Sequence, residues 1–225
     1  MSSPVVDLEG ADRALLVREI KRRRVSAILR TEDPTVAREA MYAAVRGGFD
    51  LIEFTLSIPG ALGLVAEFAQ DPRLLVGVGT VLDRDQARAA VSAGARFLVS
   101  PVLDLGLIEE PMLSGFPASP GTYTPTEMLA AHRAGADFVK LFPAPDDIAR
   151  YIIQVRGPLP FLQIFPTAGV NADNAEAILE AGAAGVGFVS SLFPSADLRD
   201  RNYDAIEQRA RAIITRLRAA PNGRQ

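Results

Sequence analysis

Short runs of apolar residues alternate with longer stretches of mixed polarity along most of the chain, beginning at Val25. The short runs are typical of buried strands, and the longer stretches carry apolar residues at the spacing of one helix face. The predicted strands are Val25–Leu29, Leu51–Leu56, Leu74–Gly79, Phe97–Val102, Pro117–Gly121, Phe138–Phe142, Leu162–Pro166 and Gly185–Ser190. The predicted helices are Pro34–Arg46, Ala61–Gln70, Arg84–Ala93, Leu105–Leu113, Pro125–Ala134, Asp146–Val155, Ala172–Ala181 and Tyr203–Arg218. Eight strand–helix units predict an α/β fold with a closed (β/α)8 arrangement, the TIM barrel.

A further amphipathic helix, over about residues 11–24, precedes the first strand and ends in the basic run Lys21-Arg22-Arg23-Arg24. Cations favour the C-terminus of a helix, so a solvated helix end explains this run, with a phosphate site as the alternative. A chain of 225 residues is within the length of one α/β barrel. We therefore expect a single domain, 1–225, with the barrel over about 25–219.

A weak internal repeat predicts which residues face one another. In each copy a glycine closes a helix shortly before a strand, and the glycines are Gly48, Gly94, Gly135 and Gly182. They are 46, 41 and 47 residues apart (94−48, 135−94 and 182−135), which is two strand–helix units per step. Inward side chains of a barrel form layers contributed by alternate strands. With equal register, one layer holds the residues five positions after each glycine, namely Glu53, Val99, Lys140 and Gly187.

Lys140 is the basic residue of an otherwise apolar strand, Phe138–Phe142. Burying an ammonium group is unfavourable, so a lysine here is either paired with an acid or kept neutral as a nucleophile for a carbonyl group. The predicted partner is Glu53. A structural Glu–Lys ion pair is the alternative, although a buried pair contributes little net stability after desolvation.

Composition narrows the possible chemistry. The chain has 24 Lys and Arg against 27 Asp and Glu, a net charge of −3, so we expect no nucleic-acid partner. The absence of cysteine and the presence of a single histidine argue against disulfides, thiolate chemistry and most zinc or triad sites. No apolar stretch has the length of a membrane span or of a signal-peptide core, so we expect a cytoplasmic protein without a membrane partner.

Active sites of such barrels lie at the C-terminal ends of the strands. Arg30 ends the first strand and could hold a carboxylate or phosphate, or could instead pair at the surface with Glu32 or Asp33. Thr80 and Thr167 offer hydroxyl groups at strand ends, where capping is the alternative role. We assign a structural role to His132 inside its helix, and expect the side chains of Glu127 and Asp137 to be solvated or to act as caps.

Six motifs in this order resemble the 2-keto-3-deoxy-6-phosphogluconate (KDPG) and 4-hydroxy-2-oxoglutarate (KHG) aldolase family. They are Ile52-Glu53-Phe54-Thr55-Leu56, Gly77-Val78-Gly79-Thr80-Val81-Leu82, Phe97-Leu98-Val99-Ser100-Pro101, Pro120-Gly121-Thr122, Val139-Lys140-Leu141-Phe142-Pro143-Ala144 and Phe165-Pro166-Thr167-Ala168-Gly169-Val170. The resemblance covers roughly 25–218. It implies a class I aldolase with a (β/α)8 barrel, usually trimeric, which needs no metal or other cofactor.

The resemblance also implies roles for individual residues. Lys140 matches the Schiff-base lysine and Glu53 the general acid and base. The substrate-binding residues implied by it are Arg30, Thr80, Pro101, Phe142, Thr167, Ala168, Gly169 and Ser190.

Two stretches depart from the family pattern. Where many members carry an arginine after the glutamate strand, this chain has Leu56-Ser57-Ile58-Pro59. The family's phosphate site has Thr-Gly-Gly and Gly-Ser, whereas this chain has Thr167-Ala168-Gly169 and Val189-Ser190. Glycine lets backbone N–H groups approach a phosphate closely, so Ala168 and Val189 narrow the predicted phosphate site.

The sequence thus predicts a class I aldolase that cleaves a 2-keto-4-hydroxy acid, such as KDPG or KHG, to pyruvate and an aldehyde. The predicted partners are a 2-keto acid, with or without a phosphate, and further copies of the chain in a homotrimer. Two alternatives remain: a phosphosugar isomerase or epimerase barrel, and a non-catalytic barrel that binds a keto acid. The sequence leaves open the substrate's tail and its stereochemistry at C4.

Overall fold

The computed structural model describes residues 12–109 and 115–219. Its strands are β1 (Val25–Leu29), β2 (Leu51–Thr55), β3 (Leu75–Gly79), β4 (Phe97–Val99), β5 (Ala118–Ser119), β6 (Gly121–Thr122), β7 (Val139–Leu141), β8 (Ile164–Pro166) and β9 (Val186–Phe188). Its helices are α1 (Arg13–Arg23), α2 (Pro34–Arg46), α3 (Ala61–Phe68), α4 (Arg84–Ser92), α5 (Leu105–Ile108), α6 (Pro125–Arg133), α7 (Ile148–Arg156), α8 (Ala175–Glu180), α9 (Ser195–Arg199) and α10 (Tyr203–Ala219).

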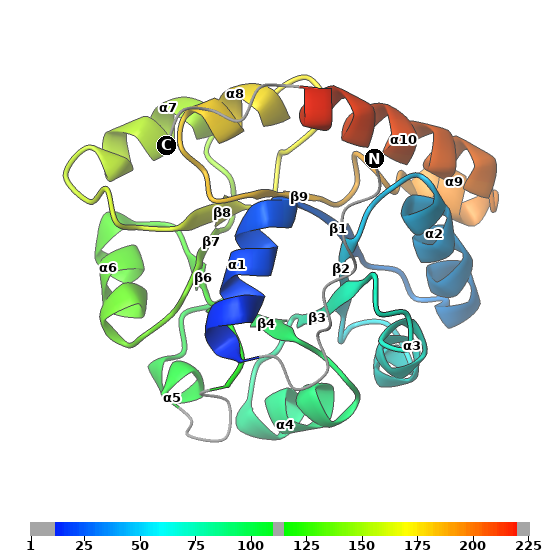
Figure 1. The fold of residues 1–225 in the computed structure, drawn as a ribbon, viewed down its shortest axis with the longest axis horizontal. Coiled ribbons are helices and arrows are strands. Elements are labelled where there is room, and N and C mark those ends of the chain that lie inside the picture. Colours follow the sequence, from blue (N-terminus) through cyan, green and yellow to red (C-terminus); the bar gives the residue numbers. More distant parts are fainter. Residues whose placement is uncertain (1–11, 110–114, 220–225) are drawn as a thin grey trace.

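All strand pairs described are parallel. One sheet has the order β5-β4-β3-β2-β1-β9 and the other the order β6-β7-β8. The strands curl into a partial barrel with helices on its outer side (Figure 1). Beside β8 and β9, the Ala184 N–H donates to the Ile164 carbonyl at 2.8 Å. The predicted α/β fold with parallel strands is therefore confirmed.

The helices begin where side chains satisfy the first backbone N–H groups, which have no partner within the helix. The capping residues are Asp12, Asp33, Asp83, Asp104, Thr124 and Asp147. At α6, Thr124 and Glu127 form a reciprocal capping box, so the expectation that Glu127 acts as a cap is confirmed.

Two apolar clusters lie on the two faces of the strands. The larger one fills the space between the strands and the surrounding helices. The second, which we call the inner cluster, consists of Leu16, Ile20, Leu51, Leu75, Phe97, Val99, Phe138 and Phe165. Because side chains alternate along a strand, β2, β3, β4 and β8 each contribute to both clusters. Val99, predicted to share a layer with Lys140, belongs to this inner cluster.

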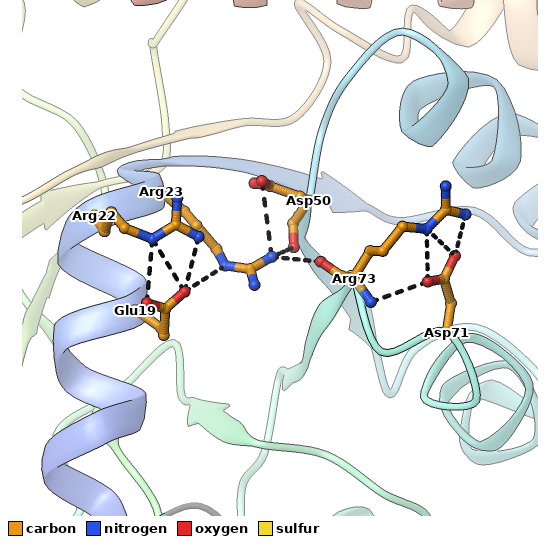
Figure 2. Close-up of polar contacts among 6 residues, drawn as sticks. All are labelled: Glu19, Arg22, Arg23, Asp50, Asp71 and Arg73. Carbon is orange, nitrogen blue, oxygen red and sulfur yellow. Dashed lines mark hydrogen bonds and ion pairs between the residues drawn. The ribbon is translucent and has the colours of Figure 1, made fainter. Parts of the chain in front are cut away.

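Helix α1 lies across the strands in Figure 1 and is tied to their N-terminal ends. Arg13 donates to both carboxylate oxygens of Asp137, which precedes β7. Arg23 donates to the carbonyls of Asp50, immediately before β2, and of Arg73, two residues before β3, at 2.6 and 2.7 Å (Figure 2). These contacts place Leu16 and Ile20 in the inner cluster.

The basic run at the end of α1 is only partly the solvated helix end that we predicted. The Arg23 side chain is only 3% exposed, and Glu19 lies between Arg22 and Arg23 (Figure 2). The hydrogen bond from Arg22 holds the pKa of the Glu19 carboxyl below its usual value. The Arg23 side chain is therefore held in the interior by hydrogen bonds to backbone carbonyls that precede two strands. The position of Arg23 in the sequence does not indicate these contacts.

Several predicted strands and helices are longer than the observed ones, and α9 is not among the predicted helices. The predicted strand Pro117–Gly121 is divided at Pro120 into β5 and β6, because proline has no N–H to continue the ladder. The predicted helix Leu105–Leu113 corresponds to α5, which ends at Ile108. Positions 110–113 of the prediction lie outside the described residues. No described helix is long and apolar enough to cross a membrane.

Candidate active site

A cavity of about 510 Å³ opens at the C-terminal ends of the strands. The lining residues come from β1, β2, β7, the ends of β8 and β9, and the segments that follow them. They are Ile28, Arg30, Glu53, Thr55, Lys140, Phe142, Thr167, Ala168, Gly169, Val170, Asn171, Val189, Ser190 and Ser191. The cavity therefore lies where parallel barrels place their ligands.

Lys140 on β7 and Glu53 on β2 both line this cavity although they lie on different sheets. Their side chains are 8% and 2% exposed. The alternation along β2 turns Glu53 inward with Leu51 below it and Thr55 above it, while Ile52 and Phe54 pack outward against the helices. The Lys140 Nζ lies 5.1 Å from the centre of the Phe142 ring, within reach of a cation–π contact when the amine is charged.

Burial dominates the electrostatics of both groups. It raises the pKa of the Glu53 carboxyl, and the positive charges of Lys140 and Arg30 oppose this only in part. Burial lowers the pKa of the Lys140 amine, which Glu53 opposes and Arg30 reinforces. A lowered pKa increases the share of neutral, nucleophilic amine, and a raised pKa favours the protonated form of a carboxyl group, which can then act as an acid.

Two glycines make room for side chains that line the cavity, Gly79 for Glu53 and Gly187 for Thr167 and Ile28. A Cβ atom on Gly79 of β3 would overlap Oε1 of Glu53 and would lie 2.8 Å from its Cδ. A Cβ atom on Gly187 of β9 would come within 3.1 Å of Cγ2 of Thr167 and would also press on Ile28. The Glu53 carboxyl therefore lies directly against the backbone of β3.

Arg30 and Thr80 meet at one side of the cavity. The Arg30 Nη2 donates to the Thr80 Oγ1 at 3.1 Å. Thr80, just after β3, has φ of 60°, a left-handed conformation that is unfavourable for a β-branched residue. This strained backbone presents the threonine hydroxyl to the arginine. Asp33, which the sequence offered as a surface partner for Arg30, instead caps α2.

The segments that follow β8 and β9 form a polar part of the cavity wall, and among the described residues they contribute no cationic side chain to it. Ser191 donates from its hydroxyl to the Val170 carbonyl at 2.7 Å. The Asn171 side-chain oxygen accepts from the N–H groups of Asp173 and Asn174. This end of the cavity therefore consists of short side chains and backbone held in a fixed loop. We call it the distal end.

Comparison with known proteins gives the family. The family model described as KDPG and KHG aldolase matches residues 16–209. The chain belongs to this aldolase family.

Relatives of this aldolase cover most of its length. The 2-dehydro-3-deoxy-6-phosphogalactonate aldolase of Escherichia coli strain K12 is 30% identical over 86% of this chain and 94% of its own. A probable enzyme of the same name from Rhizobium meliloti strain 1021 is 32% identical over 88% and 93%. A KDPG aldolase from Legionella pneumophila, solved with pyruvate captured at low pH as a covalent carbinolamine intermediate, has a TM-score of 0.76. That protein is 27% identical, covering 88% of this chain and 97% of its own.

The protein is thus an enzyme, a class I aldolase and therefore a carbon–carbon lyase. The family membership agrees with the chemistry of the cavity, which a lysine with a lowered pKa and a buried carboxyl group both line. Among the described residues no group of three or more His, Cys, Asp or Glu side chains could hold a metal ion.

Most of the residues predicted to form the aldolase site come together in the cavity. Besides Glu53 and Lys140, the predicted residues that line it are Arg30, Phe142, Thr167, Ala168, Gly169 and Ser190. Thr80 reaches it through its hydrogen bond to Arg30. Pro101 is not among the described residues that line the cavity.

Five residues that line the aldolase cavity are not among those predicted from the sequence. They are Ile28, Thr55, Val170, Asn171 and Ser191. The period-two alternation of a strand could have found Ile28, two positions before Arg30, and Thr55, two positions after Glu53. The other three lie in loops, where no periodic signal exists.

Two predicted structural residues have defined roles elsewhere. His132 is exposed on α6, with its ring 4.7 Å from that of Phe161. Asp137 is neither a helix cap nor simply solvated, because it joins Arg13 of α1 to the start of β7 and also accepts from the Ala118 N–H.

Proposed function

We propose that this aldolase cleaves a 2-keto-4-hydroxy acid to pyruvate and an aldehyde through a Schiff base on Lys140. The observation that carries this proposal is a buried amine with a lowered pKa in the same cavity as the buried Glu53 carboxyl. The Legionella relative supports it, because that protein holds pyruvate covalently as a carbinolamine.

In this mechanism the neutral Lys140 amine attacks the C2 carbonyl, and loss of water gives an iminium ion that withdraws electrons from the C3–C4 bond. Glu53 takes the proton of the C4 hydroxyl as that bond breaks and the aldehyde leaves. The remaining enamine accepts a proton at C3, and hydrolysis of the iminium ion releases pyruvate and restores the amine. Glu53 thus acts first as a base and then as the acid that protonates C3, and its raised pKa favours the protonated form needed in the second step.

We propose that Arg30 binds the C1 carboxylate of the keto acid. A guanidinium group suits a carboxylate because it can donate two parallel hydrogen bonds, and Thr80 holds it at the cavity. With this assignment the carboxylate still has an arginine partner, although the stretch Leu56-Ser57-Ile58-Pro59 lacks the arginine that many family members carry there. Phe142 and Thr167 would line the path of the reacting carbon atoms.

We propose that the substrate's tail lies at the distal end, against Ala168, Gly169, Asn171, Ser190 and Ser191. The relatives named above carry the name of a 2-dehydro-3-deoxy-6-phospho sugar acid, which supports a 2-keto-3-deoxy sugar acid for this enzyme. Pyruvate release should be measured with phosphorylated and unphosphorylated acids of both C4 configurations. The ratio of their kcat/KM values shows whether Ala168 and Val189 admit the phosphate.

Borohydride trapping tests the Schiff base directly. The chain has only two lysines, Lys21 and Lys140, so the mass of the reduced pyruvate adduct can be placed on one of them. We expect one adduct on Lys140, unchanged trapping in Lys21→Ala, and neither trapping nor turnover in Lys140→Ala. A fully active Lys140→Ala variant, or an adduct on Lys21 alone, would contradict the proposal. The isomerase and non-catalytic alternatives have no specific observation in their favour.

We also propose that the strands close into a complete (β/α)8 barrel in one domain, supported by the Ala184 to Ile164 hydrogen bond. A homotrimer that works without a metal or other cofactor follows from the family resemblance, and we propose a cytoplasmic location for it. Light scattering coupled to gel filtration measures the oligomer, and activity after chelation tests the metal.

A further inference from the structure

A second, much smaller cavity lies deeper in the interior than the substrate cavity. Its volume is about 30 Å³, and Glu53 and Thr167 border both cavities. Its other walls include residues of the inner cluster, among them Phe97, Phe138 and Phe165, and one serine of β1, Ser26. A water molecule needs roughly 10–15 Å³ of such space, so this volume is sufficient.

Two polar atoms at this cavity have no hydrogen-bond partner in the protein. They are Oγ of Ser26 and Oε1 of Glu53, and both residues are only 2% exposed. Leaving a buried polar atom without a partner is unfavourable, and interior waters usually satisfy such atoms. That two of them border one cavity of suitable size points to a shared partner.

Strand register explains why Ser26 lies below Glu53. Ser26 pairs with Leu51, and Ile28 pairs with Glu53, so Ser26 is one inward position nearer the N-terminal end than Ile28. On the other side Ser26 pairs with Gly187, which has no side chain to fill the interior beside it. The serine hydroxyl is therefore a polar group among the apolar side chains of the inner cluster, at the level just below Glu53.

We propose that an internal water molecule in this cavity links Ser26 Oγ to Glu53 Oε1 and makes Ser26 a positioning residue for the proton shuttle. The proposal rests on the proposed role of Glu53. With Oε1 held from below by the water, Oε2 is the oxygen that exchanges protons with the substrate. Thr167, which borders both cavities, offers the water a third partner.

The charged groups that act on Glu53 are Lys140 of β7 and Arg30 at the end of β1. Neither is replaced in the test below, so their effect is constant. A hydrogen bond from the water stabilises the ionised carboxylate, and its loss should raise the pKa of Glu53 further. The acidic limb of any reaction that needs ionised Glu53 should then move to higher pH.

A matched pair of variants isolates the hydroxyl group. Ser26→Thr and Ser26→Val have nearly the same shape, suit a strand equally and add the same bulk, but only threonine keeps the hydroxyl. The reaction to measure is deuterium exchange into the methyl group of pyruvate, followed by NMR as a function of pH. This reaction needs Lys140 and the proton shuttle but no aldehyde or substrate tail.

We expect exchange to be about five-fold slower in Ser26→Val than in Ser26→Thr, the effect of one ordinary hydrogen bond. Its acidic limb should lie at higher pH, while borohydride trapping on Lys140 stays equal in the two variants. Ser26→Ala, which adds no bulk, should behave as Ser26→Val does. Equal exchange rates and equal pH profiles across these variants would overturn the inference. Failure of the proposed function looks different, since the unaltered enzyme would then show neither exchange nor trapping.

Discussion

Replacing Gly79 by alanine should disable the proton shuttle without altering either catalytic side chain. The new Cβ atom would overlap Oε1 of Glu53 and lie 2.8 Å from its Cδ, whereas ordinary contacts of this kind are about 3.4 Å or longer. Because the backbone of β3 is held by β2 and β4, the carboxyl group must move, by roughly 1 Å.

The magnitude follows from the cost of misplacing a catalytic group. A displacement of about 1 Å can reduce a rate roughly 10²-fold, equivalent to about 2.7 kcal/mol in the barrier. The overpacking itself should lower the free energy of unfolding by about 1–3 kcal/mol. We therefore expect a folded Gly79→Ala enzyme with kcat reduced about 100-fold and with Lys140 still trapped by borohydride.

The assay is pyruvate release from a 2-keto-4-hydroxy acid, with trapping and thermal unfolding measured on the same samples. Gly63→Ala is the control, because a Cβ atom at Gly63 of α3 meets no atom within 4 Å. That variant should keep its activity and gain about 0.5–1 kcal/mol of stability. Wild-type kcat in a folded Gly79→Ala enzyme would refute the assignment of Glu53 as the proton shuttle.

The remaining predictions concern charge and backbone strain at the same site. Trapping should increase with pH through the pKa of Lys140, which burial lowers from its ordinary value of 10.5, because only the neutral amine attacks. Glu53→Gln should move the midpoint of trapping against pH to lower pH, and Arg30→Met should move it to higher pH, because Glu53 raises the pKa of Lys140 and Arg30 lowers it. Shifts of both midpoints in the same direction would contradict this account. Thr80→Gly should raise the free energy of unfolding by about 0.5–1 kcal/mol, as the left-handed backbone is relieved, but raise KM several-fold through loss of the contact with Arg30. Arg24 also has a left-handed backbone, with φ of 61°, but is not among the residues that line the cavity. Arg24→Gly should therefore raise the free energy of unfolding by a similar amount and leave KM unchanged. Equal KM values in the two variants would exclude a role for Thr80 in substrate binding.

Several features of the site could be predicted because they depend on local pattern. The glycine repeat predicted that Glu53 and Lys140 face a common interior, and the structure places both in one cavity. Strand ends identified Arg30 and Thr167 as candidates, because parallel strands bring their C-terminal ends to one edge. Motif resemblance contributed the family, which the family model confirms over residues 16–209.

Other features depend on contacts between segments far apart in the chain. The inward strand position of Ser26 could be inferred, but not that its hydroxyl lacks a partner, because this depends on which atoms surround it in three dimensions. The role of Arg23 is similar, since it contacts carbonyl groups 27 and 50 residues away. Hydrophobic periodicity carries no information about either contact.

The sequence by itself determined the order of strands and helices, the inward direction of the catalytic pair and the family. Each of these depends on periodicity or on motifs that are contiguous in the chain. Only the tertiary structure decided that β5 and β6 lie in different sheets, that α1 is fixed close to the starts of β2, β3 and β7, and that Glu53 lies against Gly79. The pKa shifts of Glu53 and Lys140 also depend on the tertiary structure, because the desolvation of a group is set by all the atoms packed around it.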